Sequence, residues 1–148
     1  MKEHGLTFIV DNTFLGPYLL RPLEHGADLV LHSVTTYIAG HGDALSAVVA
    51  GSKSLIDPIR YQLNVLGSCT SPFNSWLVPR GVRTLGLSME AHCANALEPA
   101  RFVERQPEVV WIRYPSLESH PNRAVARDLL REKFGEMARS GCAATEAQ

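Results

Sequence analysis

Two short runs of apolar and β-branched residues, separated by a stretch that suits a helix, place the strongest constraint on the fold. Residues 6–10 form the first run and residues 28–32 form the second. The stretch 17–25 between them begins with proline, and Gly26 follows it, a residue typical of helix ends. The order strand, helix, strand predicts two parallel neighbouring strands in an open α/β sheet, the first of them buried on both faces.

Beyond these elements, the chain alternates between strand-like and helix-like patterns. Short apolar runs bounded by glycine or polar residues predict strands, and apolar residues at a spacing of three to four predict helices. The predicted strands are 45–50 and 109–114, and the predicted helices are 53–64, two or more within 73–105, and an amphipathic one over 122–134.

These patterns also suggest how the chain is divided into domains. We expect segment 1–105 to belong to one α/β domain, 106–134 to open a smaller second domain, and 135–148 to form a disordered tail, because no period is visible there.

Composition narrows the classes of partner. A formal net charge of -1 over 148 residues provides no basic surplus for nucleic acid or an anionic membrane surface. No apolar run reaches the roughly 20 residues of a membrane span. Three scattered cysteines argue against a disulfide framework, so we expect a cytoplasmic protein. The histidines and acidic residues match no metal-ligand spacing, and we expect no metal.

Polar residues gather where the first two predicted strands end. Asp11 closes the first, and Ser33 and Thr35 follow the second. An aspartate here is also a common turn or capping residue, and the hydroxyls also suit a solvated loop. Together, however, a carboxylate for a ring nitrogen and hydroxyls for a phosphate are what a pyridine-type cofactor requires.

Longer motifs carry a resemblance that covers most of the chain. They are Val10-Asp11-Asn12-Thr13-Phe14, Arg21-Pro22-Leu23, Gly26-Ala27-Asp28, His32-Ser33-Val34-Thr35, Gly40-His41-Gly42-Asp43, Ser71-Pro72-Phe73-Asn74, Arg80-Gly81-Val82-Arg83-Thr84-Leu85, Met89-Glu90-Ala91-His92, Tyr114-Pro115 and Ser119-His120-Pro121. In this order they resemble the central stretch of the cystathionine γ-synthase/methionine γ-lyase family of pyridoxal-phosphate enzymes. The resemblance implies part of a fold-type I (aminotransferase-like) large domain with the start of the smaller C-terminal domain.

The resemblance also implies roles for individual residues. Asp11 would pair with the pyridine nitrogen of pyridoxal 5'-phosphate, and Ser33 and Thr35 would hold its phosphate. The family's Schiff-base lysine corresponds to Thr36. A threonine hydroxyl can neither form the imine nor act readily as a base at neutral pH. The resemblance therefore implies no retained catalytic residue, non-covalent and weak cofactor binding at best, and impaired activity on sulfur amino acids such as methionine or cystathionine.

The subgroup and the assembly stay open. The segment after the second strand is more similar to methionine γ-lyases, and the loop 63–70 is more similar to cystathionine γ-lyases. We expect a truncated family member in a homo-oligomer, or in a hetero-oligomer with a full-length relative. Two alternatives to a weakly active enzyme remain, namely a non-catalytic subunit that binds such a relative and a pseudogene product.

Overall fold

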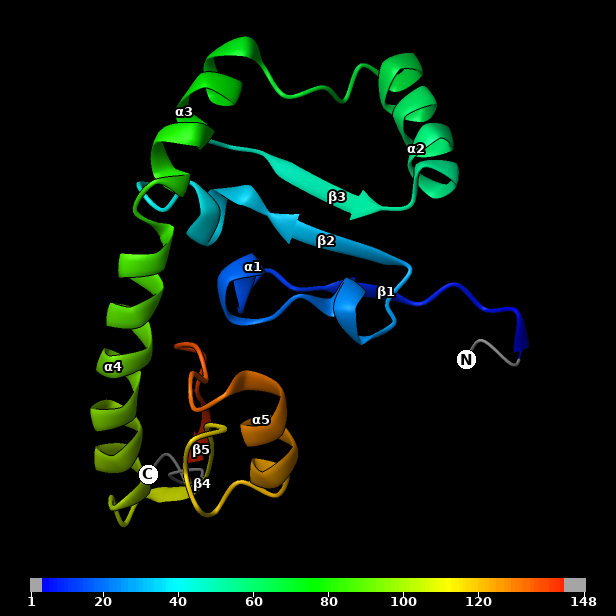
Figure 1. Cartoon of the computed structure of the whole chain (residues 1–148). Helices are drawn as coiled ribbons and strands as arrows, with labels where there is room; N and C mark the ends of the chain where they lie inside the picture. The colour runs from blue at the N-terminus through cyan, green and yellow to red at the C-terminus, as the bar shows by residue number, and fades with distance from the viewer. Residues whose placement is uncertain (1–3, 143–148) are drawn as a thin grey trace, which may run out of the picture. The chain divides into compact units, whose positions relative to one another are not determined.

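The computed structural model describes residues 4–142 and shows helices and strands in alternation (Figure 1). The chain divides into two compact units, residues 1–88 and 89–148, with the division inside helix α4. The first unit contains β1 (Ile9–Asp11), α1 (Gly16–Leu19), the 3₁₀-helix η2 (Pro22–His25), β2 (Leu29–Ser33), the π-helix η3 (Val34–Ile38), β3 (Ala47–Gly51), α2 (Lys53–Leu66), α3 (Pro72–Val82) and the start of α4 (Leu85–Glu104). The second contains the rest of α4, β4 (Val109–Arg113), α5 (Arg123–Leu130) and β5 (Arg139–Cys142).

The sheet of the first unit has the strand order β1-β2-β3. β1 and β2 are parallel, with Asp11 opposite Leu31, so the predicted pair of parallel neighbours is confirmed. β3 returns antiparallel to β2, with Ser33 opposite Ala47. The carboxyl ends of β1 and β2 therefore lie at one edge of the sheet, next to the start of η3.

The prediction that the first strand is buried on both faces is wrong. Leu6 and Ile9 are each 59% exposed. A continuous apolar run is buried on both faces only where other elements cover both faces of the sheet. β1 is an edge strand, and the described part of the first unit leaves the side chain of Ile9 uncovered.

The helices lie close to where the apolar spacing placed them. The predicted helix over 17–25 is split into α1 and η2, and Gly26 ends η2 with a φ of 88°. α2 follows the predicted helix 53–64, and α3 and α4 share the stretch 73–105. Among residues 4–142, no helix is both long enough and apolar enough to cross a membrane.

Two large side chains of the second unit are almost completely buried. Met89 is fully buried and Tyr114 is 1% exposed. The Tyr114 hydroxyl donates a hydrogen bond to the Gly135 carbonyl oxygen at 2.8 Å. Burial raises the pKa of Tyr114 to about 12, because the phenolate would lose its hydration there.

The expectation that residues from 135 onward form a tail without regular structure is wrong for residues 139–142. They form β5, which pairs antiparallel with β4. Small and polar residues give no period from which a strand can be predicted, and β5 is defined by its pairing with a distant strand rather than by its own pattern. Residues 143–148 of that stretch lie outside the described residues. The predicted domain segments 1–105 and 106–134 differ from the compact units and stay a prediction.

Candidate functional site

The predicted site residues lie at the edge where β1 and β2 end. Asp11 is the last residue of β1, and Ser33 is the last residue of β2. Thr35 and Thr36 follow within η3, a short π-helix. π-Helical turns are rare in proteins, and those that do occur often lie at functional sites.

The Asp11 carboxylate is held by a turn of its own chain. Its Oδ1 accepts hydrogen bonds from the Thr13 main-chain N–H at 3.0 Å and from the Thr13 hydroxyl at 2.6 Å. The hydroxyl bond is the main cause, and the main-chain bond the second, of a lowered Asp11 pKa. Asp11 is therefore ionised at neutral pH. Both hydrogen bonds use Oδ1, which leaves Oδ2 for a cationic partner.

Thr13 links Asp11 to the second strand. While its hydroxyl donates to Asp11, the same oxygen accepts a hydrogen bond from the Ser33 main-chain N–H at 2.8 Å. The sequence analysis missed this residue. The signal was present in the order Asp-Asn-Thr after a strand, because an aspartate often accepts a hydrogen bond from the main chain two residues later.

Asn12 also escaped the sequence analysis, and it shapes the loop that follows β1. Its side chain is almost fully buried, and its amide donates to the Gly16 and Leu20 carbonyl oxygens at 3.0 and 2.8 Å. These bonds satisfy two main-chain oxygens of the α1 turn. Asn12 therefore supports the segment that carries Asp11 and Thr13.

Ser33 and Thr36 contact each other directly. The Thr36 hydroxyl donates to the Ser33 hydroxyl oxygen at 3.2 Å. The Ser33 hydroxyl keeps its own hydrogen to donate, as binding of a phosphate oxygen requires. Thr36 is exposed, so its side chain is accessible at this edge.

Thr35 is directed elsewhere. Its hydroxyl accepts a hydrogen bond from the Ser46 main-chain N–H at 3.1 Å and donates weakly to the Ser46 carbonyl oxygen at 3.4 Å. The expectation that Ser33 and Thr35 face the same side assumed extended backbone, in which residues two apart share a face. η3 is helical instead, and residues two apart on a helix do not share a face.

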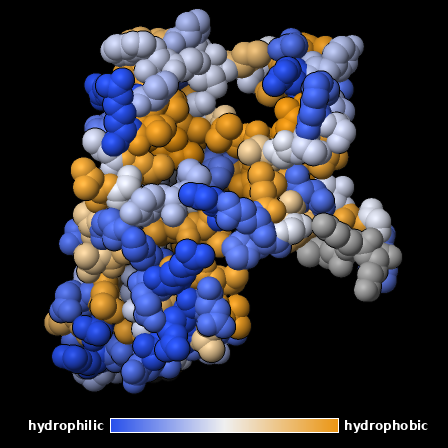
Figure 2. Space-filling model, in the orientation of Figure 1, coloured by the Kyte–Doolittle hydropathy of each residue, from blue (hydrophilic) through white to orange (hydrophobic). Residues whose placement is uncertain are grey.

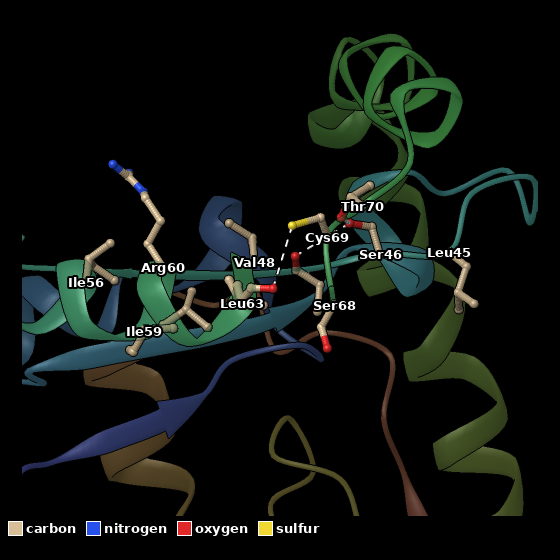
Figure 3. A pocket seen from close by; sticks show the side chains of 12 residues that line it. Leu45, Ser46, Val48, Ile56, Ile59, Arg60, Leu63, Ser68, Cys69 and Thr70 are labelled. Atoms are coloured by element: carbon tan, nitrogen blue, oxygen red, sulfur yellow. Dashed lines mark hydrogen bonds between the residues drawn. The ribbon is translucent and has the colours of Figure 1, made fainter. Parts of the chain in front are cut away.

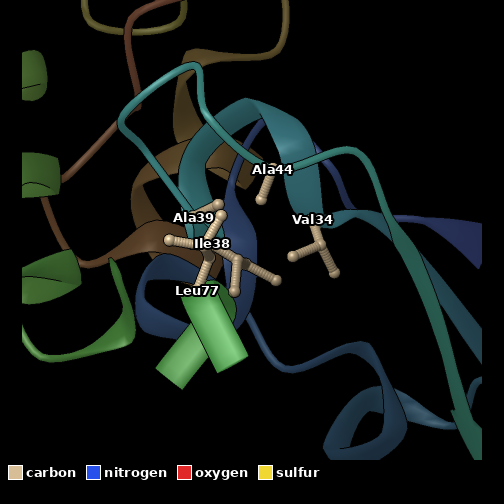
Figure 4. Close-up of a cluster of buried hydrophobic side chains, with 5 residues drawn as sticks. All are labelled: Val34, Ile38, Ala39, Ala44 and Leu77. Carbon is tan, nitrogen blue, oxygen red and sulfur yellow. The ribbon is translucent and has the colours of Figure 1, made fainter. Parts of the chain in front are cut away.

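A small hydrophobic cluster fixes η3 against α3. Figure 4 shows the side chains of the cluster converging between these elements. Gly81 of α3 lies so close to η3 that an added Cβ would be 2.1 Å from the Ala39 carbonyl oxygen. The cluster is formed by Val34, Ile38, Ala39, Ala44 and Leu77.

The loop between η3 and β3 contains His41 and Asp43, whose residue types can bind metals but whose spacing predicts no metal site. Arg80 of α3 donates to Asp43 at 2.6 Å, so this aspartate forms an ion pair within the unit. Among residues 4–142, no group of three or more His, Cys, Asp or Glu side chains is arranged to hold a metal ion.

His32 of β2 is buried beside the site. Within the described residues, its Nδ1 has no hydrogen-bond partner. Burial lowers the pKa of His32. A hydrogen bond with the Asn12 main chain and the negative charge of Asp11 act in the opposite direction but are outweighed. His32 is therefore a neutral packing residue at neutral pH rather than a second charge beside Asp11.

Comparison with known proteins identifies the family. A model of the family described as Cys/Met metabolism PLP-dependent enzymes matches residues 1–139. The chain belongs to this family. The family comprises pyridoxal-phosphate-dependent enzymes of transsulfuration, which confirms the resemblance drawn from the motifs.

Curated relatives show the extent of the match. L-methionine γ-lyase of Pseudomonas putida is 48% identical over 139 residues, which are 93% of this chain and 35% of the relative. Cystathionine γ-synthase of Haemophilus influenzae is 52% identical over 116 residues, which are 78% of this chain and 31% of the relative. The chain spans about a third of the length of these relatives.

Solved structures show the same fold. Cystathionine γ-synthase of Xanthomonas oryzae pv. oryzae in complex with cystathionine matches with a TM-score of 0.91 at 38% identity, over 99% of this chain and 38% of that one. Cystathionine γ-lyase of Lactobacillus plantarum complexed with L-serine matches with a TM-score of 0.89 at 36% identity, over 96% and 37%. The chain therefore folds as a segment of a fold-type I enzyme does, which confirms the predicted fold class.

Proposed function

We propose that this chain is the cofactor-binding segment of a pyridoxal-phosphate enzyme of sulfur amino-acid metabolism, and that it holds the cofactor without a covalent bond. Asp11 would pair with the protonated ring nitrogen, and the Ser33 hydroxyl would bind the phosphate, whereas the Thr35 hydroxyl is bonded to Ser46 and could join it only by releasing that contact. The bound cofactor would supply an electron sink for charge that develops at the substrate α-carbon. Methionine and cystathionine, named by the relatives, indicate the class of substrate.

One observation carries the proposal, namely the hydrogen-bonded connection from Asp11 through Thr13 to Ser33. It joins an ionised carboxylate to the main chain of Ser33, whose side chain carries a hydroxyl donor. A carboxylate and a hydroxyl are the two kinds of group needed at opposite ends of the cofactor. Oδ2 of Asp11 and the hydroxyl hydrogen of Ser33 are not used within this connection. The carboxylate acceptor therefore suits the protonated ring nitrogen of the cofactor, and the hydroxyl donor suits its phosphate.

Thr36 limits what the site can do. Its hydroxyl oxygen cannot form the carbon–nitrogen double bond that an amine forms with the cofactor aldehyde. Its proton is also held too tightly for general-base catalysis at neutral pH. The lysines of the chain do not replace the missing amine at this position. Lys53 lies on α2 and pairs with Asp57, and Lys133 lies in the second unit and pairs with Glu90. Lys2 lies outside the described residues. We infer that the chain turns over substrate very slowly or not at all.

The test is cofactor retention by four purified versions of the chain: the parent, Thr36→Lys, Thr36→Ala and Asp11→Ala. Each is equilibrated with pyridoxal phosphate, measured by absorbance and equilibrium dialysis, and then desalted. We expect the parent and Thr36→Ala to bind reversibly and to lose the cofactor on desalting. Thr36→Lys should retain it, and Asp11→Ala should bind more weakly. Circular dichroism confirms equal folding of the four.

Two results would overturn the proposal. If neither the parent nor Thr36→Lys binds cofactor before desalting, this chain does not form the pocket. If the parent retains cofactor after desalting as well as Thr36→Lys does, the missing lysine does not determine attachment.

A second candidate function is a non-catalytic subunit that associates with a full-length relative. The observation that favours it is the exposure of apolar side chains on β1, β3 and α2, including Ile9 and Leu66. Co-expression with a tagged full-length family member tests it. Recovery of a stable complex, with unchanged activity per full-length subunit, would support the subunit role over an independent enzyme.

A further inference from the structure

Two arginines lie directly opposite each other on the two-stranded sheet of the second unit. In the antiparallel pairing of β4 with β5, Arg113 is opposite Arg139, and both are exposed. Opposite residues of an antiparallel pair point to the same face of the sheet, with Cβ atoms about 5 Å apart. Figure 2 shows many hydrophilic residues on the surface of this unit. The two arginines therefore concentrate positive charge at one place on that surface.

The face that carries the arginines is directed away from α4. Successive residues of a strand point to opposite faces. Ile112 and Ser140, the neighbours of the two arginines, are opposite each other and line a pocket together with Val103 and other residues of α4. The face that carries Ile112 and Ser140 is therefore the one packed against the helix, and the arginine face is the outer one.

The arginine pair has no acidic partner within the described residues. The ion pairs of the second unit join other residues. Among residues 4–142, neither Arg113 nor Arg139 forms an ion pair or a side-chain hydrogen bond. Like charges directly opposite each other destabilise strand pairing. A bound anion between the two guanidinium groups would remove this repulsion and gain two attractive contacts.

A neighbouring ring holds the Arg139 guanidinium on this face. Its Cζ lies 5.4 Å from the centroid of the Trp111 ring, in a cation–π contact. Trp111 is two residues before Arg113 and therefore on the same face, opposite Gly141. A Cβ at Gly141 would be 2.6 Å from Trp111 Nε1, so the indole can lie over this position because the residue is glycine. The ring restricts Arg139 before any ligand binds, which lowers the entropy cost of binding.

The chemistry of two guanidinium groups on one face suits a phosphate. Each guanidinium presents a planar set of N–H donors that matches two oxygens of a phosphate group. A phosphate dianion also balances two positive charges. A carboxylate carries one negative charge and two oxygens, and it can satisfy one guanidinium of the pair.

We propose that Arg113 and Arg139 bind a phosphate group on the outer face of the β4–β5 sheet, as inorganic phosphate or as part of a phosphate monoester. Trp111 is a positioning residue, because it acts through Arg139. The site is separate from the candidate cofactor site, since the two arginines belong to the second unit and Ser33 to the first. The proposal does not rest on cofactor binding.

The experiment titrates the 148-residue chain with inorganic phosphate at constant ionic strength in chloride, without pyridoxal phosphate. NMR follows the indole N–H signals of the two tryptophans. Trp111 contacts Arg139, whereas Trp76 lies on α3 in the first unit and is the internal control. We expect the Trp111 signal to shift with saturation and the Trp76 signal to stay in place.

A second arm replaces inorganic phosphate with methyl phosphate. Tighter binding of methyl phosphate would identify a monoester as the preferred source, and tighter binding of inorganic phosphate would identify the free anion. Both results support the site. Acetate at the same concentration should shift the Trp111 signal much less, because it supplies one charge for two guanidinium groups.

Variants test the two arginines directly, with binding measured from the ³¹P signal of the phosphate. Arg113→Gln and Arg139→Gln each remove one charged donor group and should weaken binding by about tenfold. Arg139→Lys keeps the charge without the planar donor set, so it should weaken binding less. Arg60→Gln is the control, because Arg60 is an exposed arginine of α2 that lines the groove between α2 and β3 (Figure 3).

Three results would overturn the proposal. In the first, phosphate leaves the Trp111 signal in place or shifts both indole signals equally. In the second, Arg113→Gln and Arg139→Gln bind phosphate as the parent does while circular dichroism shows that they are folded. In the third, Ser33→Ala abolishes phosphate binding and Arg139→Gln does not, which would place the phosphate at the candidate cofactor site.

Discussion

The two helices that follow β2 and β3 differ strongly in how well their side chains are packed. η3 follows β2 and packs through Ile38 and Ala39 against Leu77 of α3, and all three residues are at most 8% exposed. α2 follows β3 and has no buried residue, with Leu66 73% exposed. The segment that carries the candidate site is therefore stabilised by packing within this chain. α2 has no comparable packing among the described residues.

The largest contrast is expected from leucine truncation in the two regions. Leu77→Ala should lower the free energy of unfolding by about 3 kcal/mol, because it removes buried methyl groups and leaves a cavity. Leu66→Ala on α2 should lower it by about 0.5 kcal/mol or less, because its side chain is already exposed. Urea unfolding of both variants measures the difference. Equal losses would show that α2 is packed as tightly as α3.

The next effect concerns the close approach of α3 to η3. Gly81→Ala should destabilise the chain by about 2 kcal/mol, since the new Cβ would be 2.1 Å from a main-chain oxygen and α3 has to shift. Ser75→Ala, at an exposed position of the same helix, is the control. Thermal unfolding compares them. A Gly81→Ala chain as stable as the control would mean that the contact between α3 and η3 is loose.

Thiol reactivity extends the comparison to the second unit. Burial raises the pKa of Cys93, and Cys93 is only partly exposed, whereas Cys69 is exposed. The thiolate is the reactive form, so Cys93 should be alkylated more slowly than Cys69, by on the order of tenfold near neutral pH. Peptide mass spectrometry after timed alkylation measures both rates. Similar rates would indicate that the second unit opens readily.

The smallest effect concerns Asp11. Its native pKa is lowered, mainly by the Thr13 hydroxyl, so its ionised form stabilises the native state above the ordinary carboxyl pKa near 4. That contribution is lost as pH falls through the lower native value. Thr13→Val should raise the Asp11 pKa and reduce the stability gained on the acid side, as followed by carboxyl NMR during titration. Thr36→Val is the control, and an Asp11 midpoint that moves equally in both variants would contradict the role of Thr13.

Much of the first unit could be predicted because local patterns agree with the fold. Residues 28–32 and Gly26 carry strand and helix-end signals that depend on the local chain alone. Their parallel pairing follows because a crossover of that length joins neighbouring parallel strands. Asp11 and Ser33 were placed at one edge by the same argument, and the structure connects them through Thr13.

The remaining features depend on contacts that no local pattern encodes. The exposure of Ile9 depends on which elements cover the sheet, and β5 exists through its pairing with β4. Residues 34–38 are helical and not extended, and the Thr35 side chain is therefore directed to Ser46. The cofactor roles of Asp11, Ser33 and Thr35 stay predictions.

Ser46 contacts two segments of the first unit. Its main-chain N–H donates to the Thr35 hydroxyl at the start of η3, and its own hydroxyl is 2.7 Å from that of Thr70 in the loop before α3. Residues that share a hydrogen-bonding partner are energetically coupled, so the effects of substitutions at Thr35 and Thr70 on the free energy of unfolding should not add. A single serine thus makes the loop before α3 and η3 parts of one energetic unit.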